Sequence, residues 1–235
     1  MHNPIIAALD VPAVETAVKL VEHLSPVVGA FKIGSELFTS AGPDVVLMIR
    51  TTGSAVFLDL KFHDIPHTVA KAVAAAVRLD VQMLTVHTSG GLAMLQAAER
   101  AARDTARSLD RPPPLVLGVT VLTSLDSQEL REVGSDAHVG RQVERLASLA
   151  VQAGLRGLVC SPLEIAALRQ SLPAEIKLVT PGIRIGPQSA DDQKRTLSPR
   201  EALEAGADWL VIGRPIYAAQ DPRAAAEGIL ATLAP

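Results

Sequence analysis

Short and almost wholly apolar runs alternate with amphipathic, alanine-rich segments along the chain. Strands that are buried on both faces give such unbroken apolar runs. The sequence predicts eight strands, at residues 5–10, 28–34, 55–62, 83–89, 115–122, 157–162, 177–183 and 209–216. Apolar residues at helical spacing predict helices at residues 13–24, 43–50, 69–79, 92–109, 139–153, 164–172, 200–205 and 223–233, with the weakest pattern in 43–50.

Eight strictly alternating strand–helix units in 235 residues indicate a (β/α)8 TIM barrel, an α/β fold. The alternative is a doubly wound open sheet, which usually has fewer strands and a glycine-rich turn after the first. The segment "ALDVPAVE" has no such turn. Because no linker interrupts the alternation, we expect a single catalytic domain over residues 1–235.

Two features of the connections matter for the fold and the site. Gly29, Gly53, Gly154 and Gly206 fall near helix-to-strand junctions, where a glycine that ends a helix is expected. Residues 123–138 form a long polar connection after the fifth predicted strand, and its length suggests a functional loop or lid.

The composition excludes several classes of function. The net charge of −3 gives no basic surface for nucleic acid or for a membrane, and 3% aromatic residues offer few platforms for stacking bases. No segment has the length of an apolar membrane span, and the first residues do not resemble a signal peptide. Cys160 lies in an apolar run and is expected to be a small core residue. These observations favour a cytoplasmic protein.

Charged residues gather at the ends of the predicted strands, which is where a barrel of this class has its chemistry. Asp59 and Lys61 are two residues apart on one strand, so their side chains share a face about 6–7 Å apart. With Asp10 and Lys32 they form an alternating set of two acids and two lysines. Packing seldom needs such a set, because burying paired charges has a desolvation cost, whereas catalytic sites often contain one. The alternative is an ion pair that only satisfies itself at the barrel mouth.

The loops after the seventh and eighth predicted strands read "TPGIRIGPQSADDQKR" and "IGRPIYAAQDP". Barrels of this class often bind phosphate with these two loops. Gly182 and Gly213 allow close approach of the backbone, and Arg184 and Arg214 can hold an anion through two donors each. A salt bridge at the barrel rim is the alternative for Arg214.

Histidines give weaker signals. His63 and His67 are four apart and could share a metal ion if a helix began early. However, Pro66 is expected in the first helical turn, with Asp64 or Ile65 before it, which leaves His63 in a loop. We therefore predict no metal site. His87, near the end of the fourth strand, is expected to be a hydrogen-bonded residue of the mouth.

The motifs "DLKFHDIPHTV", "TVLTS", "TPGIR", "DDQKR" and "VIGRPI", with Asp10 and Lys32 upstream, closely resemble the bacterial orotidine 5′-phosphate decarboxylases. The similarity extends over nearly the whole chain. Related sugar-phosphate decarboxylases and aldol-type synthases share the D-x-K-x-x-D element, but they typically have an acidic residue, which holds magnesium, at the position of Lys32.

The resemblance implies decarboxylation of orotidine 5′-monophosphate to UMP, the last step of UMP biosynthesis, in a homodimer. Lys61 would donate the proton, and Asp59 would lie beside the substrate carboxylate with Lys32 next to it. Residues of three further groups would contribute: Asp10 and Lys32 at the ribose; Thr123, or its neighbour Ser124, at the pyrimidine; and Arg184, Gln193, Gly213 and Arg214 at the phosphate. Asp64, Ile65 and Thr68 would reach the site of the neighbouring subunit.

No cofactor is expected. Many decarboxylases use an organic cofactor or a lysine Schiff base as an electron sink. The sequence shows no cofactor fingerprint, and "GLVCSP" at the sixth strand lacks the lysine of the familiar barrel aldolases. Two alternatives stay open: a magnesium-dependent decarboxylase or an epimerase on the same barrel, and a catalytically silent barrel that binds nucleotides or phosphates.

Overall fold

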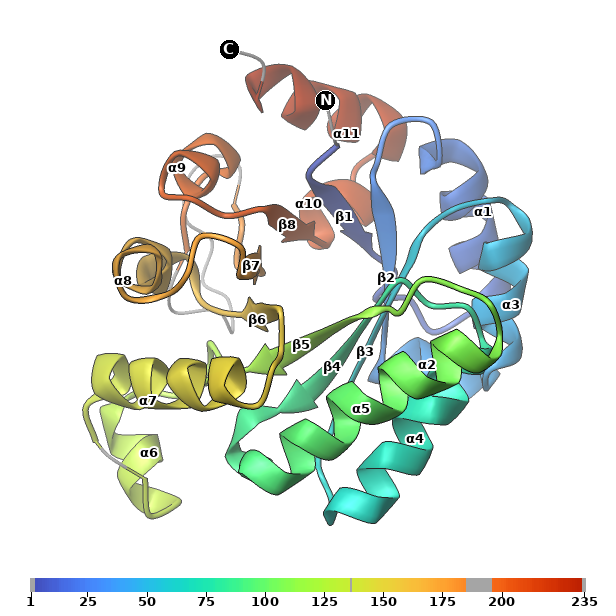
Figure 1. Cartoon of the computed structure of the whole chain (residues 1–235). Helices are drawn as coiled ribbons and strands as arrows, with labels where there is room; N and C mark the ends of the chain where they lie inside the picture. Colours follow the sequence, from blue (N-terminus) through green and yellow to red (C-terminus); the bar gives the residue numbers. More distant parts are fainter. Residues whose placement is uncertain (1–2, 136, 185–195, 234–235) are drawn as a thin grey trace.

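Eight parallel strands close into a barrel in the computed structural model, which describes residues 3–135, 137–184 and 196–233 (Figure 1). The strands follow one another in chain order, and β1 closes the barrel by pairing with β8. They are β1 (Ile5–Ala8), β2 (Ala30–Gly34), β3 (Val56–Phe62), β4 (Met83–His87), β5 (Leu115–Val119), β6 (Gly157–Val159), β7 (Lys177–Thr180) and β8 (Trp209–Ile212). The predicted (β/α)8 fold is confirmed, and the open sheet is excluded by the β1–β8 pairing.

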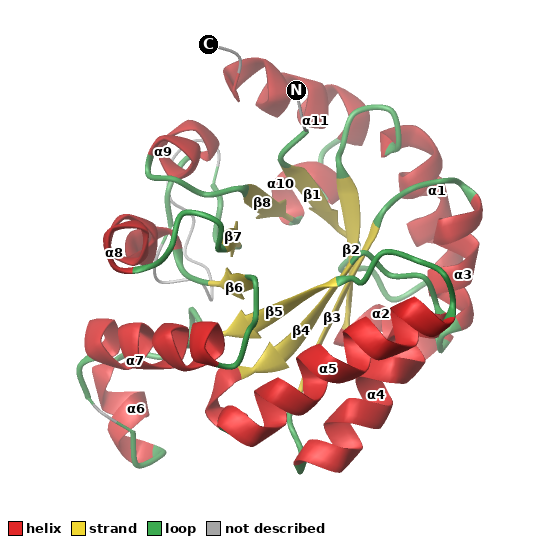
Figure 2. Ribbon diagram, viewed as in Figure 1, coloured by secondary structure: helices red, strands yellow, loops and turns green. Residues whose placement is uncertain are grey.

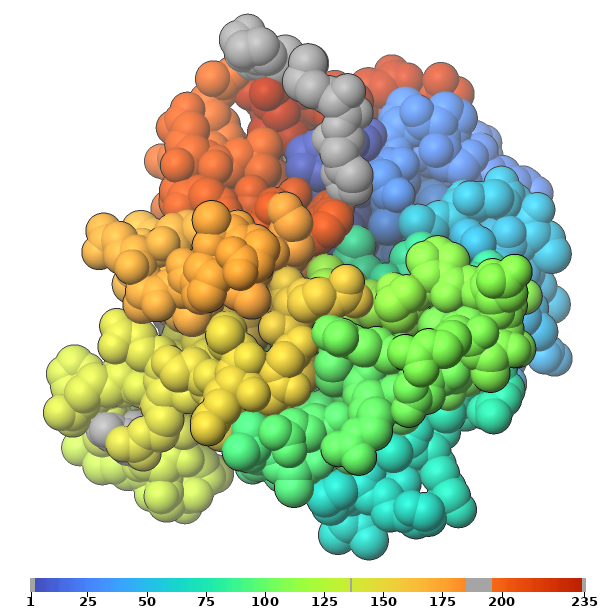
Figure 3. Space-filling view, viewed as in Figure 1, coloured from blue at the N-terminus to red at the C-terminus, as the bar shows by residue number. Residues whose placement is uncertain are grey.

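Helices surround the barrel, as Figure 2 shows. They are α1 (Val14–Leu24), α2 (Ser35–Ala41), α3 (Asp44–Thr51), α4 (Pro66–Arg78), α5 (Leu92–Ser108), α6 (Ser127–Glu132), α7 (Val139–Gln152), α8 (Ile165–Ser171), α9 (Pro199–Glu204), α10 (Arg214–Tyr217) and α11 (Pro222–Leu233), with 3-10 turns η1 (Thr88–Gly90) and η2 (Pro162–Glu164). Successive segments follow one another around the molecule in the space-filling view (Figure 3). As expected, Pro66 is the first residue of α4, with Ile65 before it.

Most predicted strands extend too far at their C-terminal ends. Residues 160–162 leave the barrel as a turn, because Pro162 cannot donate a ladder hydrogen bond and begins η2. Likewise, β8 ends at Ile212, and Arg214 already begins α10. The apolar character of these residues comes from burial at the barrel mouth rather than from strand pairing.

Three helices were not predicted: α2, α6 and α10. The loop expected at residues 123–138 contains α6, which begins with a capping box. The Asp126 side chain accepts hydrogen bonds from the N–H groups of Gln128 and Glu129, and the Glu129 carboxylate accepts one from the Asp126 N–H. The polar connection therefore has a defined start.

The barrel interior is filled by alternate strand residues, as the fold requires. Its buried members are Ile6, Ala8, Ala30, Phe57, Met83, Leu117, Val179 and Val211. The other face of the strands packs on the helices in a larger cluster. Phe57 thus faces the interior, and so it sets the direction of Asp59 on the same strand.

Two kinds of glycine occur at the junctions named above. Gly53, Gly154 and Gly206 have positive φ, as a helix-ending glycine should. Gly29 does not, and its predicted role as a helix end is wrong. A Cβ on Gly29 would lie 2.2 Å from the backbone oxygen of Asn3, so this glycine permits close approach of two chain segments.

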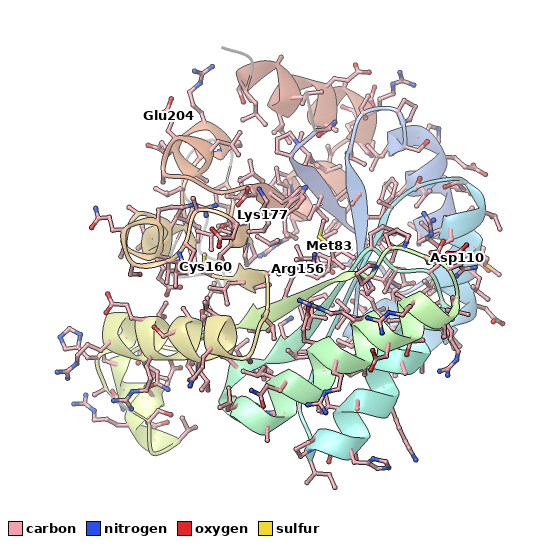
Figure 4. All side chains as sticks on the ribbon, viewed as in Figure 1. Met83, Asp110, Arg156, Cys160, Lys177 and Glu204 are labelled. Carbon is pink, nitrogen blue, oxygen red and sulfur yellow. The ribbon has the colours of Figure 1, made fainter. Side chains whose placement is uncertain are left out.

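An ion-pair cluster joins β7 and β8 where both strands begin. Lys177, which is labelled in Figure 4, donates through Nζ to Asp208 Oδ1 at 2.8 Å, and Arg169 pairs with the other oxygen. Arg169 also donates to the carbonyls of Gly206 and Ile176. Partial burial opposes ionisation of Asp208, but hydrogen bonds from Lys177, the Leu178 N–H and Arg169 hold the pKa of this carboxyl below its usual value.

No helix among the described residues is long and apolar enough to cross a membrane.

Candidate active site

A cavity of about 810 Å3 opens at the C-terminal ends of the strands. Its walls come from β1, β2, β3, β5, β6 and β8 and from loops that follow the strands, including the loop after β7. The predicted site residues that line it are Asp10, Lys32, Asp59, Lys61, Thr123, Arg184, Gly213 and Arg214. Residues far apart in the sequence meet here because parallel strands all end on one side of a closed barrel.

Four charged side chains form a continuous row across one side of the cavity. Lys32 Nζ lies 2.8 Å from Asp10 Oδ1 and 3.9 Å from Asp59 Oδ2. Lys61 Nζ lies 2.9 Å from both oxygens of Asp59. The order along the row is therefore acid, lysine, acid, lysine. Every neighbour has the opposite charge, which offsets the cost of gathering charges in a partly enclosed place.

The middle of the row is the most enclosed part. The side chains of Lys32 and Asp59 are 12% and 13% exposed, whereas those of Asp10 and Lys61 are 44% and 35% exposed. Register explains the position of Lys32, because Ala8 and Phe57, its neighbours on β1 and β3, both point into the barrel. The electrostatic interactions of the middle pair are therefore the least screened by water.

Gly34 leaves space for the side chains of the charged row. A Cβ at this position would lie 3.1 Å from Lys32 Nζ and 3.4 Å from Asp10 Oδ1. Such contacts would force the ammonium aside. The sequence reasoning did not single out Gly34, because a glycine at a strand end reads as ordinary turn chemistry.

Lys61 has an unusual backbone. Its φ is +50°, in the left-handed region that few non-glycine residues adopt. The pairing of β3 with β4 shifts register between Leu58 and Phe62, so Lys61 lies in an irregular part of the sheet. Its N–H donates to Thr85 Oγ1 at 2.8 Å instead of to a strand carbonyl. Thr85 was not predicted as part of the site.

The glycines and arginines of the last two loops also line the cavity, with Gly213 beside the Asp10 end of the row, where a Cβ would lie 3.5 Å from Asp10 Oδ2. These residues are Gly182, Arg184, Gly213 and Arg214. The Arg184 N–H donates to the Leu197 carbonyl at 3.0 Å, which ties the loop after β7 to the segment before α9. Gln193 lies outside the described residues.

Three residues with hydroxyl groups also line the cavity. Tyr217 on α10 lines the cavity and was not predicted. Partial burial raises the pKa of the Tyr217 hydroxyl, and the nearby Asp10 carboxylate adds to the effect. Thr123 and Ser124 both line the cavity, so the choice between them stays open.

Asp64, Ile65 and Thr68 do not line this cavity. All three are exposed, and Ile65 is 66% exposed. Asp64 Oδ1 accepts a hydrogen bond from the Ile65 N–H at 2.6 Å. Within one chain, the structure therefore separates these residues from the charged row.

His87 lies beside the row at the end of β4. Its ring is 5.6 Å from that of His63, measured between centroids. Burial lowers the pKa of His87, and the neighbouring His63 and Lys61 lower it further, while Asp59 opposes the shift. Among the described residues, no group of three or more histidine, cysteine or acidic side chains is arranged to hold a metal ion.

Cys160 is 1% exposed, as expected for a core residue, yet it also lines the cavity. Its Sγ lies 3.9 Å from Thr180 Oγ1.

Several known proteins are similar in sequence to this chain over nearly its whole length. The orotidine 5′-phosphate decarboxylase of Moorella thermoacetica is 55% identical over 99% of this chain and 94% of its own length. That of Opitutus terrae is 52% identical over 99% of both chains. In three dimensions, the orotidine 5′-phosphate decarboxylase of Lactobacillus acidophilus matches with a TM-score of 0.85 at 35% identity, covering 99% of this chain and 100% of its own. An uncharacterized conserved protein of Geobacillus kaustophilus matches with a TM-score of 0.86 at 32% identity, over 98% of this chain and 100% of its own.

The sequence profile of one family matches residues 3–229. Together with relatives above 50% identity, this match bears out the resemblance drawn from the motifs. The chain belongs to the Orotidine 5′-phosphate decarboxylase / HUMPS family.

Proposed function

We propose that this protein decarboxylates orotidine 5′-monophosphate to UMP and carbon dioxide, the last step of UMP biosynthesis, without an organic cofactor or a metal ion. The observation that supports this most is the row Asp10–Lys32–Asp59–Lys61 inside the strand-end cavity. The family of the chain and the names of its relatives support the same substrate.

The chemistry of the row fits this reaction. Breaking the bond between C6 and the carboxylate leaves an electron pair on C6 that no adjacent carbonyl can accept. A fixed ammonium beside C6 would stabilise that negative charge as it develops. Lys61 would then transfer a proton to C6, completing UMP as carbon dioxide leaves. Its Nζ lies 2.9 Å from both Asp59 oxygens, which hold the lysine side chain in place.

Asp59 would lie next to the substrate carboxylate. Two negative charges brought together disfavour the bound substrate relative to the transition state, in which the carboxylate charge is being lost. Lys32 and Asp10 would hold the ribose hydroxyls and keep Asp59 in place from the other side. Thr123, or Ser124, would contact the pyrimidine ring.

Phosphate binding would supply the energy that holds the substrate against this repulsion. Arg184, Gly213 and Arg214 line the cavity, with Gly213 at the Asp10 end of the row and Lys61 at the other end, and we include Gln193 in the phosphate group because of the family resemblance. A phosphate held there would be remote from C6, so it contributes to binding without touching the reacting bond.

We also propose a homodimer in which Asp64, Ile65 and Thr68 complete the site of the other subunit. Their exposure and their absence from the lining of the cavity in their own chain support this arrangement. Light scattering should give a dimer, and a mixture of Lys61→Ala and Asp64→Asn chains should regain activity when mixed, because one composite site would be intact. A fully active monomer would refute the arrangement.

A magnesium-dependent decarboxylase or an epimerase of the same barrel is the nearest alternative. Lys32 argues against it: its ammonium occupies the place between Asp10 and Asp59 that a cation would need. A silent phosphate-binding barrel is a second alternative, although such a protein would have no need for the complete charged row.

One experiment separates these functions. Purified protein is mixed with orotidine 5′-monophosphate in excess EDTA, and the absorbance of the orotate ring is followed. Loss of the band with UMP as product supports the proposal. Turnover only after magnesium is added favours the metal-dependent alternative, and binding of UMP without turnover in either buffer favours the silent barrel. A cytoplasmic location stays a prediction.

A further inference from the structure

The hydroxyl of Thr85 lies at the centre of a closed set of hydrogen bonds. It accepts from the Lys61 N–H at 2.8 Å and donates to Asp59 Oδ1 at 3.0 Å. The same Asp59 oxygen lies 2.9 Å from Lys61 Nζ. One hydroxyl group therefore touches the backbone of one residue of the row and the side chain of another.

We propose that Thr85 is a positioning residue, whose hydroxyl fixes both the Asp59 carboxylate and the Lys61 backbone so that the lysine ammonium stays aimed at the reacting carbon. Thr85 does not line the cavity, so it would act only through these two residues. The inference rests on the proposed function, since it concerns the same reaction.

The irregular pairing of β3 and β4 explains why a hydroxyl is needed here. Leu58 pairs with Leu84 in regular register, and the next pair is Phe62 with Val86. Three residues of β3 lie between these pairs and only one of β4, and the two extra residues leave the Lys61 N–H without a strand carbonyl to bond, as at a bulge. Thr85 Oγ1 takes the place of that carbonyl.

The left-handed backbone of Lys61 also needs support. A non-glycine residue with φ near +50° is strained and persists only where its surroundings hold it. This conformation directs the lysine side chain back toward Asp59. The hydrogen bond from its N–H to Thr85 is the contact that holds it from the neighbouring strand.

A threonine in a buried strand could instead serve only to fill space. Its burial decides against this view. Thr85 is 0% exposed, and a buried hydroxyl costs stability unless it has partners. Valine has almost the same shape and would fill the space without that cost. The hydroxyl is therefore explained by its partners, and both partners belong to the row.

The test compares three variants. Thr85→Val removes the hydroxyl and keeps the shape, and Thr85→Ser keeps the hydroxyl. Thr88→Val is the matched control, because Thr88 is also 0% exposed and its hydroxyl donates to a carbonyl, that of Val119, at 2.6 Å, away from the row. All three are measured for kcat, KM, UMP affinity and thermal unfolding.

We expect Thr85→Val to lower kcat by about 10- to 100-fold, because small misplacement of a catalytic group has effects of that size. UMP affinity should change by less than about threefold, because the phosphate side of the cavity is intact, and the pH dependence of kcat should shift. Thr85→Ser should return kcat to within about threefold of wild type, and Thr88→Val should lower only the unfolding temperature. Wild-type kcat in Thr85→Val, or equal kcat losses in Thr85→Val and Thr88→Val, would overturn the proposal.

A second readout does not depend on activity. Exchange of the Lys61 amide proton with solvent, measured by NMR, should be faster in Thr85→Val than in wild type, and unchanged in Thr88→Val. If wild type shows no decarboxylation, the proposed function fails on that result alone. Unchanged Lys61 exchange in Thr85→Val would instead overturn the positioning role, whatever the reaction.

Discussion

Lys61 Nζ is equally close, at 2.9 Å, to the two carboxylate oxygens of Asp59. Lys32 Nζ is 3.9 Å from the second of these oxygens and 2.8 Å from Asp10. The row therefore consists of two tight ion pairs joined by a longer contact. Substrate entering the cavity meets an acid that is firmly paired to the proposed proton donor and more loosely paired to the second lysine.

Replacing Lys61 with alanine should nearly abolish turnover. The ammonium is proposed both to stabilise the charge at C6 and to supply the proton, so kcat should fall by about 10⁴-fold or more. Circular dichroism should show an intact fold. Lys71→Ala, on the exposed side of α4, is the matched control and should keep wild-type kcat. Near-normal turnover of Lys61→Ala would remove the lysine from the mechanism.

Replacing Arg214 with alanine should mainly weaken binding. Loss of a charge-assisted contact to phosphate costs about 3 kcal/mol, or about 10²-fold in kcat/KM and in UMP affinity. Arg145→Ala, at an exposed position of α7, should leave both unchanged. Calorimetric titration with UMP measures the effect directly. If Arg214→Ala binds UMP like wild type, the phosphate lies elsewhere.

Gly34→Ala tests the room around Lys32. The new methyl group would lie 3.1 Å from Lys32 Nζ, so the ammonium must move by a few tenths of an ångström. The backbone at residue 34 has φ −92°, which alanine accepts without strain. We expect a loss of about tenfold in kcat/KM with little change in unfolding temperature. Wild-type kinetics would show that the Lys32–Asp10 geometry is not critical.

The lowered pKa of His87 predicts that the folded protein loses stability at acid pH. Its pKa in the folded protein is lowered from 6.5, mainly by burial, so the unfolded chain binds the proton more tightly. The free energy of unfolding should therefore fall as pH drops below 6.5, until the pH reaches the lowered pKa, and should be unaffected above 6.5. Urea unfolding at a series of pH values measures this slope. The slope should be smaller in His87→Gln, and equal slopes in both proteins would contradict the prediction.

Asp208→Asn should affect stability and not activity. Removing the charge leaves Arg169 and Lys177 without their shared carboxylate in a partly buried cluster, at a cost of about 2 kcal/mol in the free energy of unfolding. The cluster lies where β7 and β8 begin, at the opposite end of these strands from the cavity. Thermal unfolding and kcat, measured on the same sample, should separate the two effects, and a large loss of kcat in a folded variant would contradict this division.

The barrel could be predicted because each strand is an apolar run and because glycines mark several of the junctions between helices and strands. The ends of the strands could not, since buried loop residues at the mouth are as apolar as strand residues. The signal for α6 was present: Asp126 and Glu129 have the spacing of a capping box. For α10 the sequence offers less, because a helix of four residues has too few positions to show a period.

Some residues of the candidate site could likewise be predicted from the sequence, and others could not. Charged residues at strand ends are visible in a sequence, and six of those predicted line the cavity, together with Thr123 and Gly213. Thr85 and Gly34 gave no signal, because threonine is common in strands and glycine is common at turns. Their importance comes from distances to Lys61 and Lys32, which depend on the register between strands. The positive φ of Lys61 likewise results from the bulge.

The alternating row has a consequence for how this sequence can change over time. Removing any one member leaves a neighbour with an unmatched charge in a partly enclosed place, whereas removing an adjacent acid and lysine together does not. Substitutions along the row should therefore be strongly epistatic, with Asp59→Asn and Lys61→Met less damaging to folding together than the sum of each alone. Chains descended from this one would then be expected to lose or exchange these charges in pairs, and single replacements would be rare intermediates.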